Sequence, residues 1–259
     1  MTVTTSTVEG LATITLARPK AHNALDAATK VAFLEAVTAV ADTPSVRAVL
    51  LTAEGKNFCV GQDLAEHVAA LEADPATAMS TLEEHYNPII RALAGLSVPV
   101  VVAVQGACVG AGFGIVLAGD IRVAGEHTSF GTAFTGIGLA SDSGLSHALV
   151  STLGPSRATG LMLLGDKVTA QQAAEWGLVH RVVPDDEVES TARELALRLA
   201  SGPTAAFARV KSLIKASSEG LDATLDREAV AQSELVTTVD HKAAVSAFLA
   251  KEKPAFVGR

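Results

Sequence analysis

Glycines crowd one short stretch of the chain, QGACVGAGFGIVLAGD at residues 105–120, which directly follows the apolar run VPVVVAV. The spacing of Gly110, Gly112 and Gly114 does not fit the G-x-G-x-x-G turn that binds dinucleotides, and no GxxxxGK[ST] phosphate loop occurs. Glycine lets the main chain approach a ligand closely, and the first N–H groups of a helix have no partners inside that helix. We therefore predict a strand-to-helix turn whose amides stabilise a developing negative charge.

A second turn with related properties is predicted at residues 56–64, KNFCVGQDL, after a predicted strand that ends near Thr52. Gly61 permits tight main-chain geometry, and Asp63 favours the start of a helix. Two strand-to-helix turns that each supply one N–H group suffice for an oxyanion hole, a pair of donors that stabilises a charged oxygen.

The segments that must position these turns alternate between strands and helices. Near-continuous β-branched runs predict strands covered on both faces, and the alternating run LATITL predicts a further strand. Asp26 is placed to cap a helix at Ala27–Ala41, on which we expect one apolar stripe made of Val31, Leu34, Val37 and Val40. This alternation predicts an α/β fold with parallel strand pairing. The predicted strands are residues 11–16, 46–52, 98–104, 121–124 and 178–183.

After residue 183 the pattern changes to helices alone. Helices are predicted at residues 186–200, 204–216, 221–236 and 242–250, with no strand between them. Apolar faces on the terminal helices need partners, so we expect this end of the chain to pack on another subunit. We divide the chain into a core at residues 1–200, which carries the site, and a helical oligomerisation region at residues 201–259.

The composition excludes several classes of function. The 259 residues carry a net charge of −8 without a clustered Lys/Arg stripe, which argues against nucleic acid or an anionic membrane as a partner. Cys59 and Cys108 are expected to be buried thiols in a reducing compartment, and the histidines lack the spacing of a metal site. Pro99 and glycines interrupt the apolar run at residues 98–119, and no secretory signal opens the chain, so we expect a cytoplasmic protein without a membrane span.

Together the two turns resemble one protein family. KNFCVGQDL resembles the F-C-x-G-x-D-L element of the crotonase (enoyl-CoA hydratase/isomerase) superfamily, and QGACVGAGFGIVLAGDIRVA resembles its second oxyanion element. RPKAHNAL at residues 18–25 resembles its CoA-contacting motif, and FGTAFTGIGLASDSG and the closing VSAFLAKEKPAFVGR continue the resemblance in order. The resemblance implies a crotonase-like spiral of ββα units, a C-terminal helical trimerisation region and an acyl-CoA thioester as ligand. A homotrimer or a dimer of trimers is expected.

The resemblance also assigns roles to positions of this chain. It implies that the backbone N–H groups of Gln62 and Ala111 form the oxyanion hole. CoA is part of the substrate, so no separate cofactor is expected. The implied substrate-contacting and CoA-contacting positions are Ala21, Asn23, Ala24, Leu25, Gly61, Asp63, Leu64, Gly110 and Phe134, together with Lys253 and Phe256, which are expected to reach CoA from a neighbouring subunit.

The acid–base residues decide which reaction the oxyanion hole serves. Hydratases of the superfamily use two glutamates, and their positions are occupied here by Gly114 and Phe134, which cannot transfer a proton. Asp142 matches an aspartate that isomerases of the superfamily use as acid and base, and apolar neighbours are expected to raise its pKa. The resemblance therefore favours an isomerase that shifts a double bond or opens a ring epoxide, closest to the phenylacetate-pathway isomerases.

Three other functions stay open. The first is a hydratase-type lyase with non-standard residues. The second is a 4-chlorobenzoyl-CoA dehalogenase, in which the aspartate is the nucleophile; those enzymes use a tryptophan at the position of Phe134 and a histidine at that of Asn87, although His85 lies nearby. The third is a protein that binds acyl-CoA without catalysis.

Overall fold

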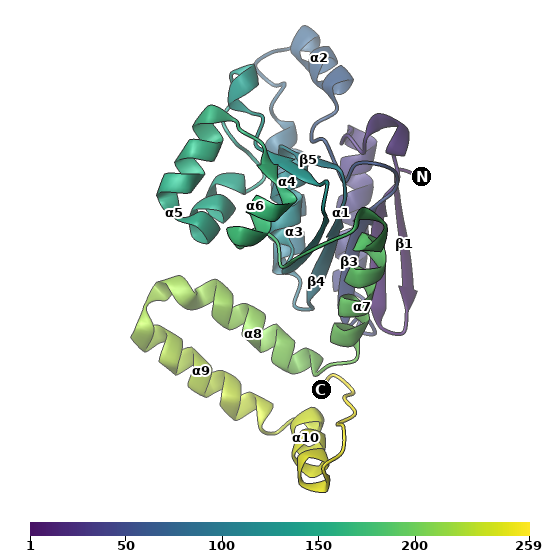
Figure 1. Ribbon diagram of the computed structural model, residues 1–259, viewed down its shortest axis with the longest axis vertical. Helices are drawn as coiled ribbons and strands as arrows, with labels where there is room; N and C mark the ends of the chain where they lie inside the picture. Colours follow the sequence, from purple (N-terminus) through teal and green to yellow (C-terminus); the bar gives the residue numbers. More distant parts are fainter.

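Two β-sheets organise the computed structural model, which describes residues 1–259 (Figure 1). The larger sheet has six strands in the order β1-β2-β3-β4-β6-β9, and the smaller has three in the order β5-β7-β8. The strands of the larger sheet are β1 Val3–Val8, β2 Leu11–Leu16, β3 Ala48–Ala53, β4 Val100–Val104, β6 Ile121–Gly125 and β9 Arg181–Val183. Those of the smaller sheet are β5 Ala107–Val109, β7 Ser129–Gly131 and β8 Val168–Thr169.

The central strands are buried on both faces, as their near-continuous apolar sequences predict. Every residue of β3 and β4 is buried, and successive side chains enter two different cores because strand side chains alternate between faces. Val49 and Leu51 pack in the larger core, whereas Ala48 and Leu50 face the helix α7, Val188–Ala200, in the smaller one.

Strand pairing is parallel through the middle of the larger sheet, from β2 to β9. The prediction of parallel pairing is confirmed for the five predicted strands. Antiparallel pairing occurs between β1 and β2 and between β7 and β8, where at least one strand of each pair is not among those predicted. The tight turn at Glu9 and Gly10, both at positive φ, allows the antiparallel β1–β2 hairpin.

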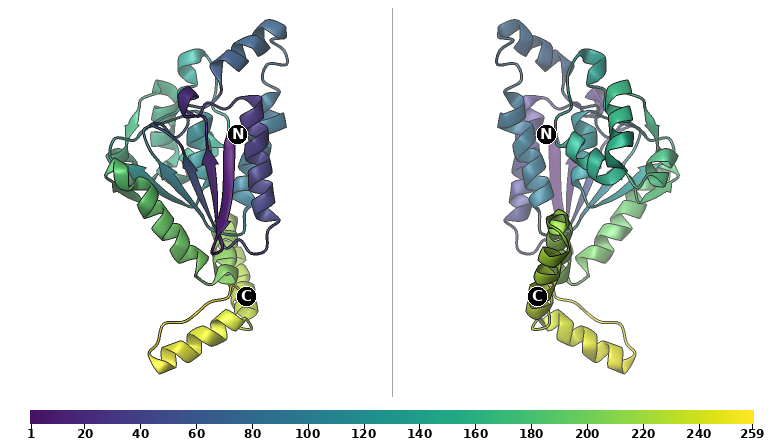
Figure 2. Two further views of the ribbon diagram at one scale, coloured as in Figure 1. Left: turned by 90° about the vertical axis from the view of Figure 1, so that its right-hand side faces the viewer. Right: turned by 90° about the vertical axis from the view of Figure 1, so that its left-hand side faces the viewer.

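Helices cover both faces of the larger sheet, in the layered arrangement seen in Figures 1 and 2. The single helix α7 packs on one face, while α1, α3 and α4 pack with the smaller sheet on the other. The helices of the core are α1 Ala27–Ala41, α2 Leu64–Ala73, α3 Asn87–Gly95, α4 Ala111–Ala118, α5 Leu145–Leu164, α6 Ala170–Glu175 and α7 Val188–Ala200. The helix α5 is kinked at Gly154, which has non-helical backbone angles and precedes Pro155.

The helix α1 begins at the predicted residue and is capped as predicted, because the Asp26 carboxylate accepts a hydrogen bond from the Thr29 N–H at 2.8 Å. Its buried face differs from the predicted stripe. Val31 is 44% exposed, whereas Phe33 and the charged Lys30 are fully buried. Lys30 can be buried on this face of the helix because its charged group has polar partners inside the protein.

Three terminal helices project from one end of the sheets (Figures 1 and 2). They are α8 Thr204–Ala216, α9 Leu221–Leu235 and α10 Val239–Ala250, close to the predicted bounds. Lys211 ties α8 to the core by binding Asp120 at 2.6 Å. No residue of α8 is fully buried, and Ile214, Leu221 and Phe248 each expose more than half of their surface. None of the helices in the protein combines the length and apolar character that crossing a membrane requires.

Candidate active site

A cavity of about 510 Å³ lies between α2, the start of α4 and the loop that follows β7. It is lined mainly by apolar side chains, among them Leu64, Met79, Phe134 and Leu139. Gln62, Ala111 and Asp142, which the sequence places far apart, all reach its wall. The structure therefore brings the three candidate catalytic positions to one space.

The two predicted turns lie side by side, joined by main-chain hydrogen bonds. The Phe58 N–H donates to the Gln105 carbonyl at 2.8 Å, and the Val109 N–H donates to the Cys59 carbonyl at 2.9 Å. A Cβ atom at Gly112 would lie only 2.5 Å from that same Cys59 carbonyl oxygen, closer than atoms can approach. The glycine is thus required because the two turns touch backbone to backbone.

Gly61 brings the N–H groups of the two turns together. It adopts a φ of +87°, and a Cβ atom there would lie 3.5 Å from the Ala111 nitrogen. On the other side, the Leu25 N–H donates to the Gly61 carbonyl at 2.8 Å and the Asp63 N–H donates to the Leu25 carbonyl at 3.2 Å. In this parallel pattern the intervening Gln62 N–H points away from Leu25.

Neither candidate donor has an acceptor inside the protein. The Gln62 N–H makes no hydrogen bond to backbone or side chain. Ala111 is the first residue of α4, so its N–H has no acceptor within the helix, and Gly110 offers no capping side chain. Two free N–H groups therefore sit next to one another in the cavity wall, at a helix N-terminus that favours negative charge.

Asp142 lies in the loop between β7 and α5, where one carboxylate oxygen, Oδ1, is buried without a hydrogen-bond partner. Burial raises the pKa of this carboxyl group above its ordinary value. The loop packs against the first turns of α4, because a Cβ atom at Gly114 would lie 2.5 Å from the Ser143 carbonyl oxygen. The same helix therefore positions both the Ala111 N–H and the loop that carries the carboxylate.

The other titratable groups of the cavity wall are Asp63, His67 and Tyr86. The Asp63 carboxylate is engaged, since it caps α2 and binds the Arg18 guanidinium at 3.1 Å. Burial raises the pKa of Tyr86, so its hydroxyl stays protonated at neutral pH. Asp142 is consequently the carboxylate of the cavity that is free to exchange a proton.

The predicted contact positions separate into three groups. The first lines the cavity and comprises Ala21, Ala24, Gly61, Asp63, Leu64, Gly110 and Phe134. The second, Asn23 and Leu25, does not reach it: Asn23 is buried and bonds the main chain of Glu54 and Asn57, and Leu25 is fully buried. The third, Lys253 and Phe256, belongs to the terminal tail outside this cavity.

The cysteines are structural in this arrangement. Cys59 and Cys108 form no disulfide and are fully buried, and a parallel β-bridge joins their main chains. Burial raises the pKa of the Cys59 thiol to about 12, so it stays protonated and unreactive. This agrees with the expectation of buried thiols.

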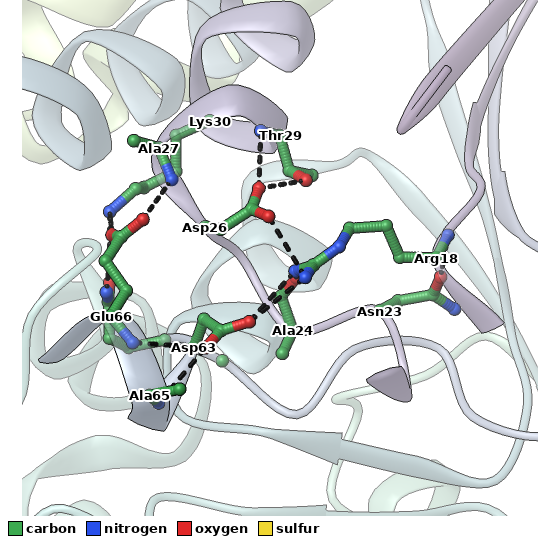
Figure 3. A network of polar contacts seen from close by, with 12 residues as sticks. Arg18, Asn23, Ala24, Asp26, Ala27, Thr29, Lys30, Asp63, Ala65 and Glu66 are labelled. Atoms are coloured by element: carbon green, nitrogen blue, oxygen red, sulfur yellow. Dashed lines mark hydrogen bonds and ion pairs between the residues drawn. The ribbon is translucent and has the colours of Figure 1, made fainter. Parts of the chain in front are cut away.

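A polar network that sequence reasoning missed surrounds the Gln62 turn (Figure 3). Arg18 binds Asp63 and also Asp26, the cap of α1, while Lys30 binds Glu66. The helical spacing could have indicated this network, because Lys30 shares the face of α1 that carries Phe33 and Val37. A lysine on a buried helix face indicates an internal partner.

Comparison with known proteins places the chain in a family. Residues 6–259 match the family profile described as enoyl-CoA hydratase/isomerase. A crystal structure from Mycobacterium abscessus, described as an enoyl-CoA hydratase/isomerase, superimposes with a TM-score of 0.98 at 56% identity, covering 99% of this chain and 100% of that one. The protein therefore belongs to the enoyl-CoA hydratase/isomerase family, whose crotonase fold it shares.

The names of similar proteins include both reaction types. The chain is 39% identical to the 1,2-epoxyphenylacetyl-CoA isomerase of Escherichia coli, over 97% of this chain and 96% of that protein. It is 40% identical to a Rhodobacter capsulatus protein named "Probable enoyl-CoA hydratase", again over 97% of this chain and 96% of the relative.

The contact between the two turns predicts that alanine substitution changes the free energy of unfolding much more at one glycine than at another. Replacing Gly112 with alanine places a methyl group against the Cys59 carbonyl, and we expect a loss of about 1–3 kcal/mol in the free energy of unfolding. Gly160→Ala is the matched control, because a Cβ atom at this helical glycine meets nothing within 4 Å. Urea denaturation measures both variants. Equal stability of the two would contradict the close contact.

Proposed function

We propose that this protein is an acyl-CoA isomerase in which Asp142 moves a proton while the N–H groups of Gln62 and Ala111 hold the enolate oxygen of the thioester. The observation that carries the proposal is the convergence of two free N–H groups and one unpartnered carboxylate on a single apolar cavity. Each group alone is ordinary, but together they match what proton transfer next to a thioester requires.

The reaction proceeds in two proton transfers. The Asp142 carboxylate removes a proton from the α-carbon, the electron pair of that C–H bond forms a double bond to the carbonyl carbon, and the π pair of the carbonyl moves onto the thioester oxygen to give an enolate. The two N–H groups stabilise this oxyanion, and one such donor typically contributes about 2.7–4 kcal/mol to transition-state stabilisation. The protonated Asp142 then returns the proton to another carbon, so the double bond shifts and no water is consumed.

Residues at the two glutamate positions disfavour hydration. The space in which a side chain at Gly114 would start is filled by the main chain of Ser143, so a glutamate cannot be accommodated without moving that loop. Phe134 lines the cavity at the second position and cannot activate water. The names of the relatives support an enzyme of this family, and the acid–base residues favour isomerisation over hydration.

Aromatic dehalogenation is a weaker candidate. The dehalogenases carry their histidine at the position of Asn87, whereas the histidine that lines this cavity, His67, comes from α2. His85 instead contacts the Thr81 hydroxyl at 3.3 Å, and neither it nor Asn87 lines the cavity.

The acyl group is expected to be apolar, since the cavity wall contains no lysine or arginine that could pair with a second carboxylate. A phenylacetyl ring epoxide, the substrate type in the name of the Escherichia coli relative, and an aliphatic 3-enoyl chain both meet this condition. With an epoxide the same enolate-stabilising groups would assist ring opening. No cofactor other than the CoA of the substrate takes part.

We further propose that residues 201–259 assemble three copies of the chain, or two such trimers. The support is the exposed apolar side chains of α8 to α10. These helices project away from the rest of the chain (Figure 1). Lys253 and Phe256, which do not line the cavity of their own chain, would then contact CoA across the subunit boundary.

The acid–base assignment predicts the behaviour of one variant. Asp142→Asn removes the proton acceptor but keeps the size of the side chain, so we expect isomerisation of a 3-enoyl-CoA to fall by about 10²–10⁴-fold while affinity for the thioester is retained. Mass spectrometry of the wild-type product separates the reactions, because an isomer keeps the mass of the substrate and a hydrated product gains one water. Equal rates in wild type and variant would remove Asp142 from the mechanism, and no turnover on any acyl-CoA would favour the non-catalytic alternative.

The raised pKa of Asp142 predicts the acidic limb of the pH profile. The base acts only when ionised, so kcat/KM falls as the pH falls through the pKa of the free enzyme. Because burial raises that pKa, the limb should lie above pH 3.8, the ordinary value of an aspartate. Steady-state kinetics over the acidic range measures it. A limb at or below that pH, or one that persists in Asp142→Asn, would contradict the assignment.

The oligomer proposal predicts a mass in solution. Light scattering should give three or six times the 26.5 kDa of one chain. Ile214→Glu places a charge on the exposed apolar face of α8 and should weaken association, whereas Val8→Glu, equally exposed on β1, should not. A monomeric wild type would contradict the proposal.

A further inference from the structure

The buried ammonium of Lys30 lies at the centre of the network behind the Gln62 turn. Its side chain is 1% exposed, and Nζ donates to Glu66 Oε1 at 2.7 Å, Thr81 Oγ1 at 2.7 Å and Gln62 Oε1 at 3.2 Å. A buried charge is costly unless it is paired and hydrogen-bonded, and here all three N–H donors of the ammonium are used.

The Gln62 side chain is held at both ends of its amide. Its Oε1 accepts from Lys30 and from the Tyr86 hydroxyl at 2.6 Å, while its Nε2 donates to Glu66 at 2.9 Å. Only one orientation of the amide satisfies these partners, because two donors face the oxygen and a carboxylate faces the nitrogen. The residue whose N–H group serves the oxyanion is therefore fixed through its side chain as well as through the main chain at Leu25.

Apolar packing secures the strand side of this turn, where Phe58 and Cys59 are fully buried, but it contributes little on the helix side. The helix α2, which follows it directly, has no buried residue, and Leu64 and Val68 expose more than half of their surface. Ion pairs hold this part of the turn instead. Arg18 binds Asp63 on one side of the turn, and Lys30 binds Glu66 on the other (Figure 3). The helix side of the Gln62 turn is thus held by polar contacts.

Stability alone does not explain a lysine at this position. An apolar side chain of similar volume on the buried face of α1 generally stabilises a protein as well as a buried ion pair does, or better. What an apolar residue cannot supply is a directed hydrogen bond to the Gln62 amide.

We propose that Lys30 is a positioning residue for catalysis, which acts through the Gln62 side chain to hold the Gln62 N–H in line with the thioester oxygen. The inference rests on the proposed function, because it assigns a supporting group to one of the two oxyanion donors. Tyr86 shares the task by donating to the same amide oxygen.

The test compares kcat with KM for Lys30→Met, Gln62→Met and the double variant. Loss of an oxyanion donor lowers kcat by about 10²–10³-fold, and for a donor that is misaligned we expect about a 10–100-fold fall with KM changed less than about threefold. Because Lys30 acts through Gln62, the double variant should lose no more than the larger single loss. Additive losses would overturn the proposal. Lys211→Met is the matched control, since it removes another ion-paired lysine outside the cavity and should leave kcat unchanged.

A spectroscopic measurement separates this proposal from the proposed function. Infrared spectra of a saturated acyl-CoA, isotope-labelled at the thioester carbonyl, report how strongly the N–H groups polarise that bond, and they need no turnover. We expect a shift to lower frequency on binding to the wild type and a smaller shift with Lys30→Met. A full shift with folded Lys30→Met would overturn the positioning role but would leave the isomerase proposal intact. Failed turnover of the wild type together with the expected shifts would overturn the isomerase proposal but would leave the positioning role intact. If Lys30→Met does not fold, Tyr86→Phe, which keeps the ring, must reduce the shift, and a full shift there would overturn the proposal.

Discussion

Main-chain packing at glycines is the constraint on which the site depends. Gly112 lies against the Cys59 carbonyl and Gly114 against the loop that carries Asp142, each so closely that a side chain would intrude, and Gly61 adopts a positive φ beside the start of α4. Three segments that are distant in the sequence therefore pack with their main chains in direct contact. These contacts fix the positions of the two free N–H groups and of the carboxylate.

Electrostatics then gives the assembled groups their chemical character. The apolar cavity wall raises the pKa of Asp142 and strengthens any interaction between the N–H groups and a developing oxyanion, because few competing dipoles surround them. Behind the donor turn, the fully buried Lys30 and the partly buried Arg18 are both paired with carboxylates. Although burial opposes its ionisation, hydrogen bonds from Lys30 and its neighbours hold the pKa of Glu66 below its ordinary value, so the pair stays charged.

The sequence predicts the parts of the fold that have strong local patterns. The long apolar strands and α1, whose cap at Asp26 is a local hydrogen bond, follow from spacing and residue type. The strand β1 escapes notice because VTTSTV carries few apolar residues at an exposed edge, and the smaller sheet escapes because its strands have at most three residues. The resemblance of the two turns located the candidate site, but the role of Lys30 could not be predicted, since its partners come from distant segments that only the fold brings together.

A crystal structure of Asp142→Asn with a bound 3-enoyl-CoA would show whether the donors and the side chain at position 142 meet the thioester. We expect the thioester oxygen to lie about 2.7–3.1 Å from the nitrogens of both Gln62 and Ala111, with the side chain at position 142 facing the α-carbon. A thioester oxygen that contacts neither nitrogen, or a side chain at position 142 turned toward solvent in the complex, would contradict this expectation.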